Sequence, residues 1–346
     1  MASQRSAGLT QGSFLAEWKS ADMTRALLAN AVVHELATGT VPTVVIAGVG
    51  KCGTNYLAGV LDRHGGIGSP PHDACKSLLM PRQGYCDEIN WPCTEWHWRG
   101  NGRHTYLQHF ARLGNHSAAR FVYDQSTSYV APVCPPLIAS ALVLRSQPKA
   151  PFRAVFLMLC DPVRAAWSRM NDVNIDSIYK DTGQSFAWAQ ITPADVIAMA
   201  SLLAVGERPF KWGQSSRYNL SGEATVGAQL QFQLKLPLLI QSYIAEFNSS
   251  FVPLVSERAK QQPNYVPTAV AQTLGLPRAA SEETKSVHSQ AGSPGYLSSS
   301  GDEFDALVAK LRGVYAPVYR KLRGQLWQHR GEDLAKWWVP EMFDTS

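Results

Sequence analysis

The chain has 346 residues, of which 45% are hydrophobic and 17% charged, as expected of a globular protein with a full hydrophobic core. Its net charge of +5 comes from scattered Lys and Arg, which argues against a nucleic-acid-binding surface. No run of residues approaches the roughly 18 consecutive apolar positions that a membrane span requires.

Apolar residues recur at helical spacing over 12–38, which predicts one or two amphipathic helices in an N-terminal segment, 1–40. Residues 41–340 are predicted to form one domain, with a surface loop at 279–302. Short apolar runs predict strands at 43–49, 119–123, 153–159 and 251–255. Because these runs alternate with helical patterns, we expect an α/β fold with a central parallel sheet flanked by helices.

Residues 42–57 read PTVVIAGVGKCGTNYL, a strand that runs into glycines around Lys51 and then into a helix. This P-loop-like strand–loop–helix presents backbone N–H groups and a helix N-terminus to a phosphate. The Walker A pattern, however, needs Gly where Val45 stands, and a Mg²⁺-binding hydroxyl where Cys52 stands. A nucleotide kinase is therefore disfavoured.

The pattern G-V-x-K-C-G-T closely resembles the 5′-phosphosulfate loop of sulfotransferases that use 3′-phosphoadenosine 5′-phosphosulfate (PAPS). The resemblance implies that Lys51 is a catalytic cation on the bridging oxygen of the phosphosulfate. It also implies donors to the 5′-phosphate from the surrounding loop, which comprises Gly50, Lys51, Cys52, Gly53, Thr54 and Asn55.

A second segment, 152–171, reads FRAVFLMLCDPVRAAWSRMN and follows the same family pattern. In that pattern an Arg and a Ser bind the 3′-phosphate of the nucleotide. Ser168 matches the Ser, but Cys160 stands at the position of the Arg. A thiol cannot replace a bidentate guanidinium, so we expect Arg164 or Arg169 to bind the phosphate together with Ser168.

Two later segments keep the family order. Residues 251–277 read as a strand, a Ser-Glu pair and a helix that ends in Leu-Gly-Leu-Pro. Residues 307–327 resemble a C-terminal helix pair separated by Tyr-x-Pro. The resemblance thus extends over about 42–338, and it implies a sulfotransferase-like fold.

Sulfuryl transfer needs a base that takes the proton of the acceptor. The sequence DEINW places Glu88 in a setting similar to the Glu-x-x-aromatic signature of the glycan sulfotransferases. The alternative bases are His72, His97 and His104. An acceptor-binding wall is predicted from three aromatic residues, Trp96, Trp98 and Tyr106, for which a place in the core is the alternative.

Other positions that are cationic in the family are neutral here. In YDQSTSYV, Gln125 occupies the position of a Lys and Thr127 that of a Pro. GSPGYL offers Gly295 and Tyr296 where the family has Lys-Gly-Arg, and the upstream substitutes are Lys285 and His288. The chain therefore either binds PAPS with rearranged cations or binds it poorly.

The sequence has features of more than one cellular compartment. The N-terminus lacks the apolar core of a signal peptide, which predicts a soluble protein, cytoplasmic as written or in the Golgi lumen if an anchor is missing. Against a cytoplasmic location, glycosylation acceptors occur at Asn115, Asn219 and Asn248. Four cysteines could pair in an oxidising compartment, namely Cys75, Cys86, Cys93 and Cys134.

The resemblance implies a PAPS-dependent enzyme that sulfates a hydroxyl or amine of a carbohydrate or related small-molecule acceptor. No metal, nucleic-acid partner or membrane span is expected, and the cysteine spacings do not fit a zinc site. The alternative is a degenerate family member that binds a nucleotide or glycan without turnover.

Overall fold

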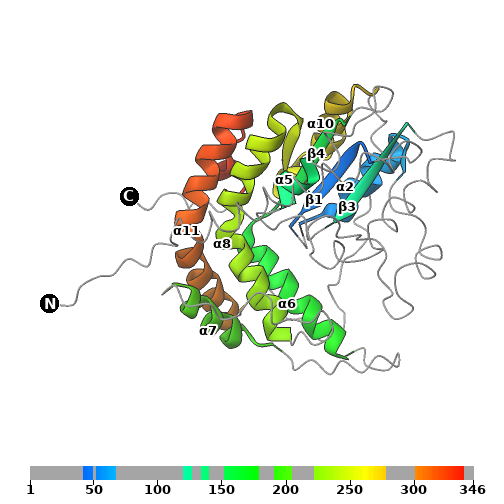
Figure 1. Ribbon diagram of the computed structural model, residues 1–346. Coiled ribbons are helices and arrows are strands. Elements are labelled where there is room, and N and C mark those ends of the chain that lie inside the picture. Colours follow the sequence, from blue (N-terminus) through cyan, green and yellow to red (C-terminus); the bar gives the residue numbers. More distant parts are fainter. Residues whose placement is uncertain are drawn as a thin grey trace.

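The computed structural model describes residues 42–49, 52–67, 120–126, 134–139, 152–178, 191–204, 222–277 and 301–338 (Figure 1). Within these residues, five parallel strands form one sheet in the order β2-β3-β1-β4-β5. The strands are β1 (Val44–Gly48), β2 (Gly66–Ile67), β3 (Phe121–Ser126), β4 (Ala154–Leu159) and β5 (Phe251–Val255). The prediction of an α/β fold with a central parallel sheet is confirmed.

The four predicted strands are all present, and β2 is an edge strand that was not predicted. β1, β4 and β5 are buried along their whole length, since helices cover both faces of the sheet. In the central register, Val44 of β1 lies opposite Tyr123 of β3 and Ala154 of β4. Burying each large apolar side chain contributes roughly 1.5–3 kcal/mol, and this is what holds such runs as strands.

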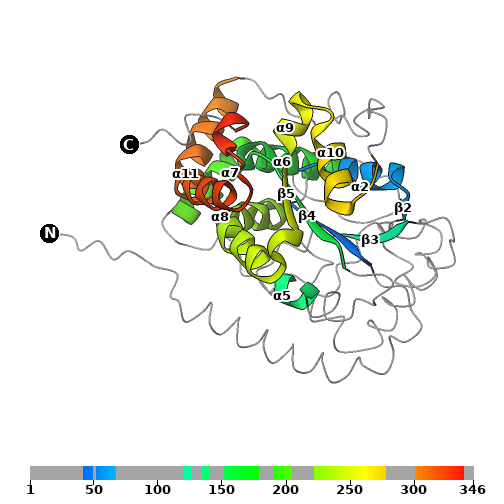
Figure 2. The same ribbon diagram turned by 90° about the horizontal axis from the view of Figure 1, so that it is seen from above.

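Helices cover the two faces of the sheet (Figure 2). On one face α2 (Thr54–Arg63) packs against α10 (Tyr265–Leu274), and on the other α5 (Cys134–Ile138) packs against α8 (Gly222–Phe247). The last turn of α2 is tied to the sheet because the Tyr123 hydroxyl donates a hydrogen bond to Asp62, 2.8 Å away. The helix α10 ends as predicted, with Gly275 in the left-handed region at φ 64°.

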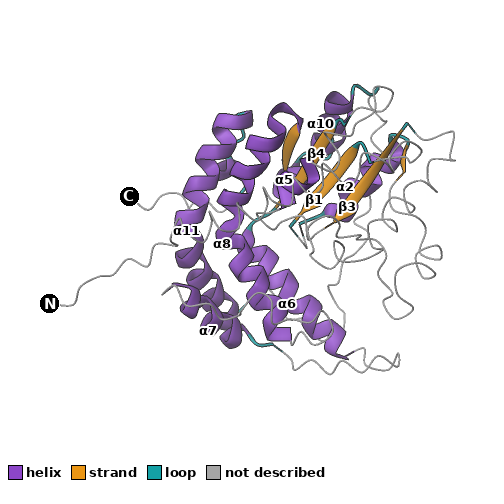
Figure 3. Ribbon diagram, in the orientation of Figure 1, coloured by secondary structure: helices purple, strands orange, loops and turns teal. Residues whose placement is uncertain are grey.

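Beside the sheet, α8 packs with three further helices, α6 (Pro162–Ile178), α7 (Pro193–Ala204) and α11 (Asp302–Arg330), in a separate helical layer (Figure 3). Shorter elements are η5 (Asn248–Ser250), α9 (Ser256–Gln261) and η6 (Leu334–Lys336). No described helix is both long and apolar enough to cross a membrane.

The prediction of two C-terminal helices separated by Tyr-x-Pro is wrong, because α11 continues through Pro317. Proline removes one backbone hydrogen bond from a helix, but the buried stripe of α11 continues on both sides of Pro317. The residues of this stripe are Leu307, Leu311, Tyr315, Tyr319, Leu322 and Leu326. Packing of this stripe against α7 and α8 outweighs the local cost of the proline.

The chain connections reverse direction between β1 and β4, and the carboxyl ends of these two strands form a switch point that we call the crevice, after its equivalent in other open α/β sheets. From β1 the chain runs to β2 and β3 on one side of it, and from β4 to β5 on the other side. In open α/β sheets, ligands bind where the direction of the connections reverses in this way. The loop that follows β1 and the corner that follows β4 meet at this point.

Candidate functional site

The loop after β1 leads into the uncapped N-terminus of α2. The backbone N–H of Cys52 donates to the carbonyl of Val49 at 3.1 Å, which closes a turn at the end of the strand. Gly53 then takes φ 97°, in the left-handed region that favours glycine, and as the N-cap residue it has no side chain with which to cap the helix. The first N–H groups of a helix have no partner within the helix, so those of α2 are groups that can donate to an anion.

Gly48, at the end of β1, leaves no room for a side chain. A Cβ atom at this position would lie 1.9 Å from Cγ2 of Thr54, which is itself buried. The absence of a side chain at Gly48 thus lets the first residue of α2 pack directly against the strand.

We expect Gly48→Ala to lower the free energy of unfolding by about 1–3 kcal/mol, because the methyl group must displace Thr54. The matched control is Gly59→Ala within α2, where the new Cβ would meet only Arg63, at 3.9 Å. Alanine favours a helix, so the control should be neutral or stabilising by up to about 1 kcal/mol. Urea unfolding measures both changes, and equal midpoints for wild type and Gly48→Ala would contradict the packing argument.

Gln125 contacts the loop side of α2 from the end of β3. Its Nε2 donates to Oδ1 of Asn55 at 2.8 Å. Gln125 is buried and Asn55 is exposed, so the hydrogen bond fixes the side-chain amide of Asn55 near the carboxyl end of β3. Because the oxygen of Asn55 is engaged, its Nδ2 group is the part oriented to donate to an anion. Gln125 thus holds the side chain of Asn55, one of the residues predicted to bind the phosphate.

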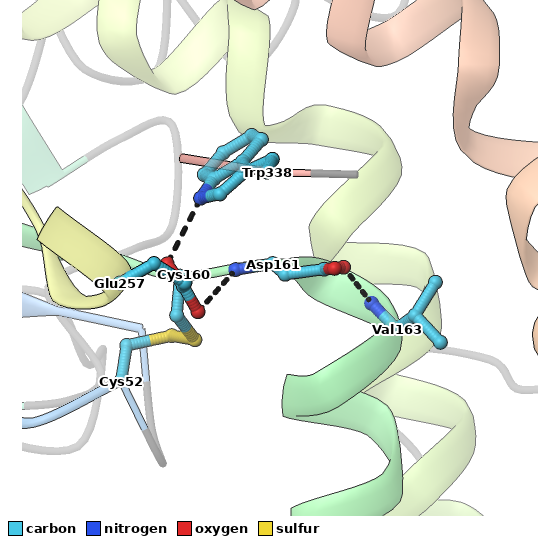
Figure 4. Close-up of a disulfide and its surroundings, with 6 residues drawn as sticks. All are labelled: Cys52, Cys160, Asp161, Val163, Glu257 and Trp338. Carbon is cyan, nitrogen blue, oxygen red and sulfur yellow. Dashed lines mark hydrogen bonds between the residues drawn. A yellow bond between two sulfur atoms is a disulfide. The ribbon is translucent and has the colours of Figure 1, made fainter. Parts of the chain in front are cut away.

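Cys52 and Cys160 form a disulfide between the loop and the end of β4 (Figure 4). Their Cα atoms lie 5.1 Å apart although 108 residues separate them in sequence, and their side chains are 1% and 5% exposed. Cys160 therefore offers no thiol at the position where an Arg was expected. Cys134, one of the four cysteines predicted to pair, is also disulfide-bonded.

The sequence interpretation missed the Cys52–Cys160 bond because it assigned the two cysteines separately, one to the loop and one to a lost Arg. The sequence nevertheless contained a signal for this disulfide. Each cysteine follows a strand of the predicted parallel sheet, and the carboxyl ends of neighbouring parallel strands meet at one edge.

Asp161 joins the end of β4 to α6. Its carboxylate accepts a hydrogen bond from the backbone N–H of Val163 at 2.9 Å, which caps the helix, and Pro162 occupies the first helical position. The backbone N–H of Asp161 donates to Glu257 Oε1 at 3.2 Å, and Trp338 Nε1 donates to Glu257 Oε2 at 3.0 Å. Figure 4 shows these contacts next to the disulfide.

Both carboxyl groups of this corner are buried, at 3% exposed for Asp161 and 6% for Glu257. Burial raises the pKa of each group above its ordinary value, and the charge of Asp161 further raises the pKa of Glu257. The ionised forms therefore cost the folded chain stability at neutral pH.

We expect wild type to lose stability relative to Glu257→Gln as the pH rises above 4.5, the ordinary pKa of glutamate. Above that pH the unfolded chain has lost a proton that the folded chain still holds, so rising pH favours unfolding by up to about 1.4 kcal/mol per pH unit until the folded-state pKa is passed. Urea unfolding of both proteins from about pH 4 to 8 measures the difference. A difference that is constant across this range would contradict the assignment.

The segment after α11 contacts the carboxyl end of β5. Besides the bond from Trp338 to Glu257, Nη1 of Arg258 lies 2.6 Å from Oε2 of Glu332. The guanidinium of Arg258 also lies over two aromatic rings, 4.1 Å from the centroid of Tyr265 and 5.3 Å from that of Trp337. These contacts hold residues 332–338 against α9 and α10.

Of the two candidate arginines on α6, Arg164 shares a face with Ser168. Arg164 and Ser168 are four residues apart and therefore lie on the same side of the helix. Arg169 follows Ser168 directly and points about 100° away from it. Arg164 is exposed on the first turn, while Ser168 and Arg169 are half-buried. The geometry favours Arg164 as the partner of Ser168.

Several predictions lie outside the described residues. The catalytic candidates among them are Lys51 with its neighbour Gly50, Glu88, and the alternative bases His72, His97 and His104. The same holds for the segment 1–40, the loop 279–302, the three aromatics of the acceptor wall and Thr127. It also holds for Lys285, His288, Gly295, Tyr296, Asn115, Asn219, Cys75, Cys86 and Cys93. Asn248 is described, and it is exposed in the turn before β5.

Within the part of the chain that is described, no group of three or more His, Cys, Asp or Glu side chains is placed to hold a metal ion. The donors at the crevice are the N–H groups of α2 and the amide of Asn55, whereas the carboxylates of Asp161 and Glu257 at the same corner are buried. Ser256 also lies there, with its Oγ 3.6 Å from the position that a Cβ of Gly53 would occupy. This set suits an anionic ligand.

No family model and no curated protein matches the chain. Among solved structures it is similar to a sulfotransferase from Alicyclobacillus acidocaldarius, with 15% identity, a TM-score of 0.49, and coverage of 86% of this chain and 99% of that one. It is also similar to the sulfotransferase domain from the curacin biosynthetic pathway, with 12% identity, a TM-score of 0.38, and coverage of 81% and 98%.

Proposed function

We propose that the chain is a PAPS-dependent sulfotransferase that acts on a hydroxyl or amine of a carbohydrate or related metabolite. In this reaction the acceptor oxygen or nitrogen bonds to the sulfur, the bond from sulfur to the bridging phosphate oxygen breaks, and the acceptor proton goes to a base. The products are the sulfated acceptor and 3′-phosphoadenosine 5′-phosphate. The observation that carries the proposal is the N-terminus of α2, without a side-chain cap from Gly53, at the β1/β4 crevice. In the sequence it follows Lys51 closely.

The residues predicted to bind the donor and the acceptor have roles that suit this chemistry. The first N–H groups of α2 and the amide of Asn55 would bind the 5′-phosphate. Lys51 would stabilise the charge that develops on the bridging oxygen, and Glu88 would take the acceptor proton. Sulfuryl transfer by such a site depends on positioning and electrostatics rather than on covalent chemistry by the protein.

The disulfide adds to the argument against a nucleotide kinase. P-loop kinases bind Mg²⁺ through a Ser or Thr hydroxyl directly after the loop Lys. Here that position is Cys52, whose sulfur is bonded to Cys160. The loop therefore lacks the group that would hold Mg²⁺ against a nucleoside triphosphate.

A thermal-shift experiment tests the proposed donor. A ligand that binds only the folded chain raises Tm with its concentration, so 3′-phosphoadenosine 5′-phosphate should raise Tm strongly and ATP with Mg²⁺ little. Transfer of labelled sulfate from PAPS to a panel of glycan and phenolic acceptors then tests turnover. A larger shift with ATP and Mg²⁺ would support a kinase instead.

The second candidate is a binding protein of the same fold without turnover. This candidate is favoured by two neutral residues at positions where cations were expected to bind the donor. Cys160 forms a disulfide with Cys52, and Gln125 forms a hydrogen bond with Asn55. Nucleotide binding without sulfation of any tested acceptor would support this candidate.

We expect Arg164→Ala to weaken the binding of 3′-phosphoadenosine 5′-phosphate about 10- to 100-fold, because hydrogen bonds to charged groups contribute about 1.5–3 kcal/mol each. Binding of adenosine 5′-phosphate, which lacks the 3′-phosphate, should change little. Isothermal titration calorimetry measures both affinities, with Arg169→Ala as the matched control on the other side of Ser168. Equal losses for the two nucleotides would contradict a role for Arg164 at the 3′-phosphate.

A further inference from the structure

The Cys52–Cys160 disulfide spans the crevice at which the proposed donor binds. Cys52 belongs to the loop that leads into α2, and Cys160 is the last residue before the corner that starts α6. The two helices that start here pack against different neighbours, α2 against α10 and α6 against α8. The disulfide is thus a covalent connection between the two sides of the crevice (Figure 4).

The two ends of this bond differ in how well their surroundings hold them. On the Cys160 side, Asp161 is fixed through both its side chain and its backbone, and Glu257 is fixed by Trp338. On the Cys52 side, the described backbone contact is one hydrogen bond, to Val49. The loop also contains Gly50 and Gly53, and glycine loses more conformational freedom than other residues when it is ordered.

We propose that Cys52 and Cys160 are positioning residues whose disulfide holds the anion-binding loop in the form that binds the donor. The inference rests on the proposed function. The sulfur of Cys52 is anchored to a rigid corner, so the N–H groups of the next residues, Gly53 and Thr54, are held toward the crevice before the ligand arrives. Binding then does not have to order a glycine-rich loop, which raises affinity without an added contact to the ligand.

Reduction should therefore weaken donor binding while the sheet remains folded. A dithiol such as dithiothreitol supplies two electrons and two protons, which converts the disulfide to two thiols as the dithiol closes to its cyclic disulfide. Both cysteines are buried, so the bond is reduced only when the loop opens.

The test compares wild type with Cys52→Ala/Cys160→Ala, and with Cys134→Ala as the control that removes a disulfide cysteine of α5. Calorimetry with 3′-phosphoadenosine 5′-phosphate and with pyrophosphate should show affinity about tenfold lower or more in the double variant, and near wild type in the control. In turnover assays the KM for PAPS should rise more than kcat falls. Equal affinity in wild type and the double variant would overturn the proposal.

Pyrophosphate separates this inference from the proposed donor. If wild type binds pyrophosphate but not the adenosine nucleotide, and the double variant loses pyrophosphate binding, the positioning role stands and the PAPS assignment fails. If wild type binds neither anion, the positioning role is overturned.

Hydrogen–deuterium exchange keeps the test valid should the double variant fail to fold. In wild type treated with dithiothreitol, the amides of residues 53–57 should exchange faster, while those of β4 should stay protected. Equal acceleration in both segments would show a general loss of structure and would overturn the proposal.

Discussion

We expect Lys51→Ala to lower the rate of sulfuryl transfer by a factor of about 10²–10³, the usual cost of removing a cation or donor directed at developing charge. In the sequence, Lys51 lies between Val49 and Cys52, whose backbone groups are hydrogen-bonded, and three residues before the start of α2. As the sulfur–oxygen bond breaks, negative charge builds on the phosphate that leaves, and a cation in this loop stabilises that charge. The effect should appear in kcat at saturating PAPS.

The folded chain should tolerate Lys51→Ala, so its Tm should match that of wild type. The matched control is Lys321→Ala, which removes the same charge from an exposed position on α11. Wild-type turnover by Lys51→Ala would exclude the phosphosulfate-loop assignment. A similar loss of turnover in Lys321→Ala would show that the effect comes from the net charge of the protein rather than from the position of Lys51 in the loop.

We expect Glu88→Gln to lower turnover by about 10²–10⁴ while donor affinity is kept or raised. The bound donor is anionic, and a carboxylate beside it is disfavoured in its charged form, which moves its pKa toward the pH at which an acceptor proton must be removed. Glutamine keeps the shape and hydrogen bonding of the side chain but cannot take the proton. Single-turnover sulfation with preformed donor complex measures the step directly.

The adjacent carboxylate provides the control, since Asp87→Asn should leave turnover near wild type. If Glu88→Gln turns over normally and replacing His72, His97 or His104 abolishes activity, the base is a histidine. The similarity to the glycan sulfotransferase signature would then not extend to the mechanism.

The strands were predictable because burial on both faces leaves a strong signal in the sequence. β5 covers the predicted 251–255, and β1, β3 and β4 begin within two residues of their predicted starts. β2 was not predictable, because two residues are too few for any periodicity. α11 was predicted as two helices because proline usually ends a helix. Here the packing of its buried side chains keeps the helix continuous through Pro317.

The strand–loop–helix was predictable from its glycines. Gly53 adopts a φ of 97° just before α2, and Gly48 leaves the space in which Thr54 packs. The partners of the loop were not predictable in the same way. Gln125 reaches Asn55 across 70 residues and Cys160 reaches Cys52 across 108, and both contacts depend on the order of the strands in the sheet. A single sequence gives the strands but not their order.

The contact between Glu257 and Trp338 has a consequence for how the chain folds during its synthesis. Trp338 is made 81 residues after Glu257, which is about four seconds or more at 5–20 residues per second. During this interval all five strands can be present on the ribosome while the carboxyl end of β5 still lacks the indole that covers it. Cys52 and Cys160 have both been made by then, so exchange with an oxidising disulfide, which is itself reduced to two thiols, can join them before the C-terminal segment docks.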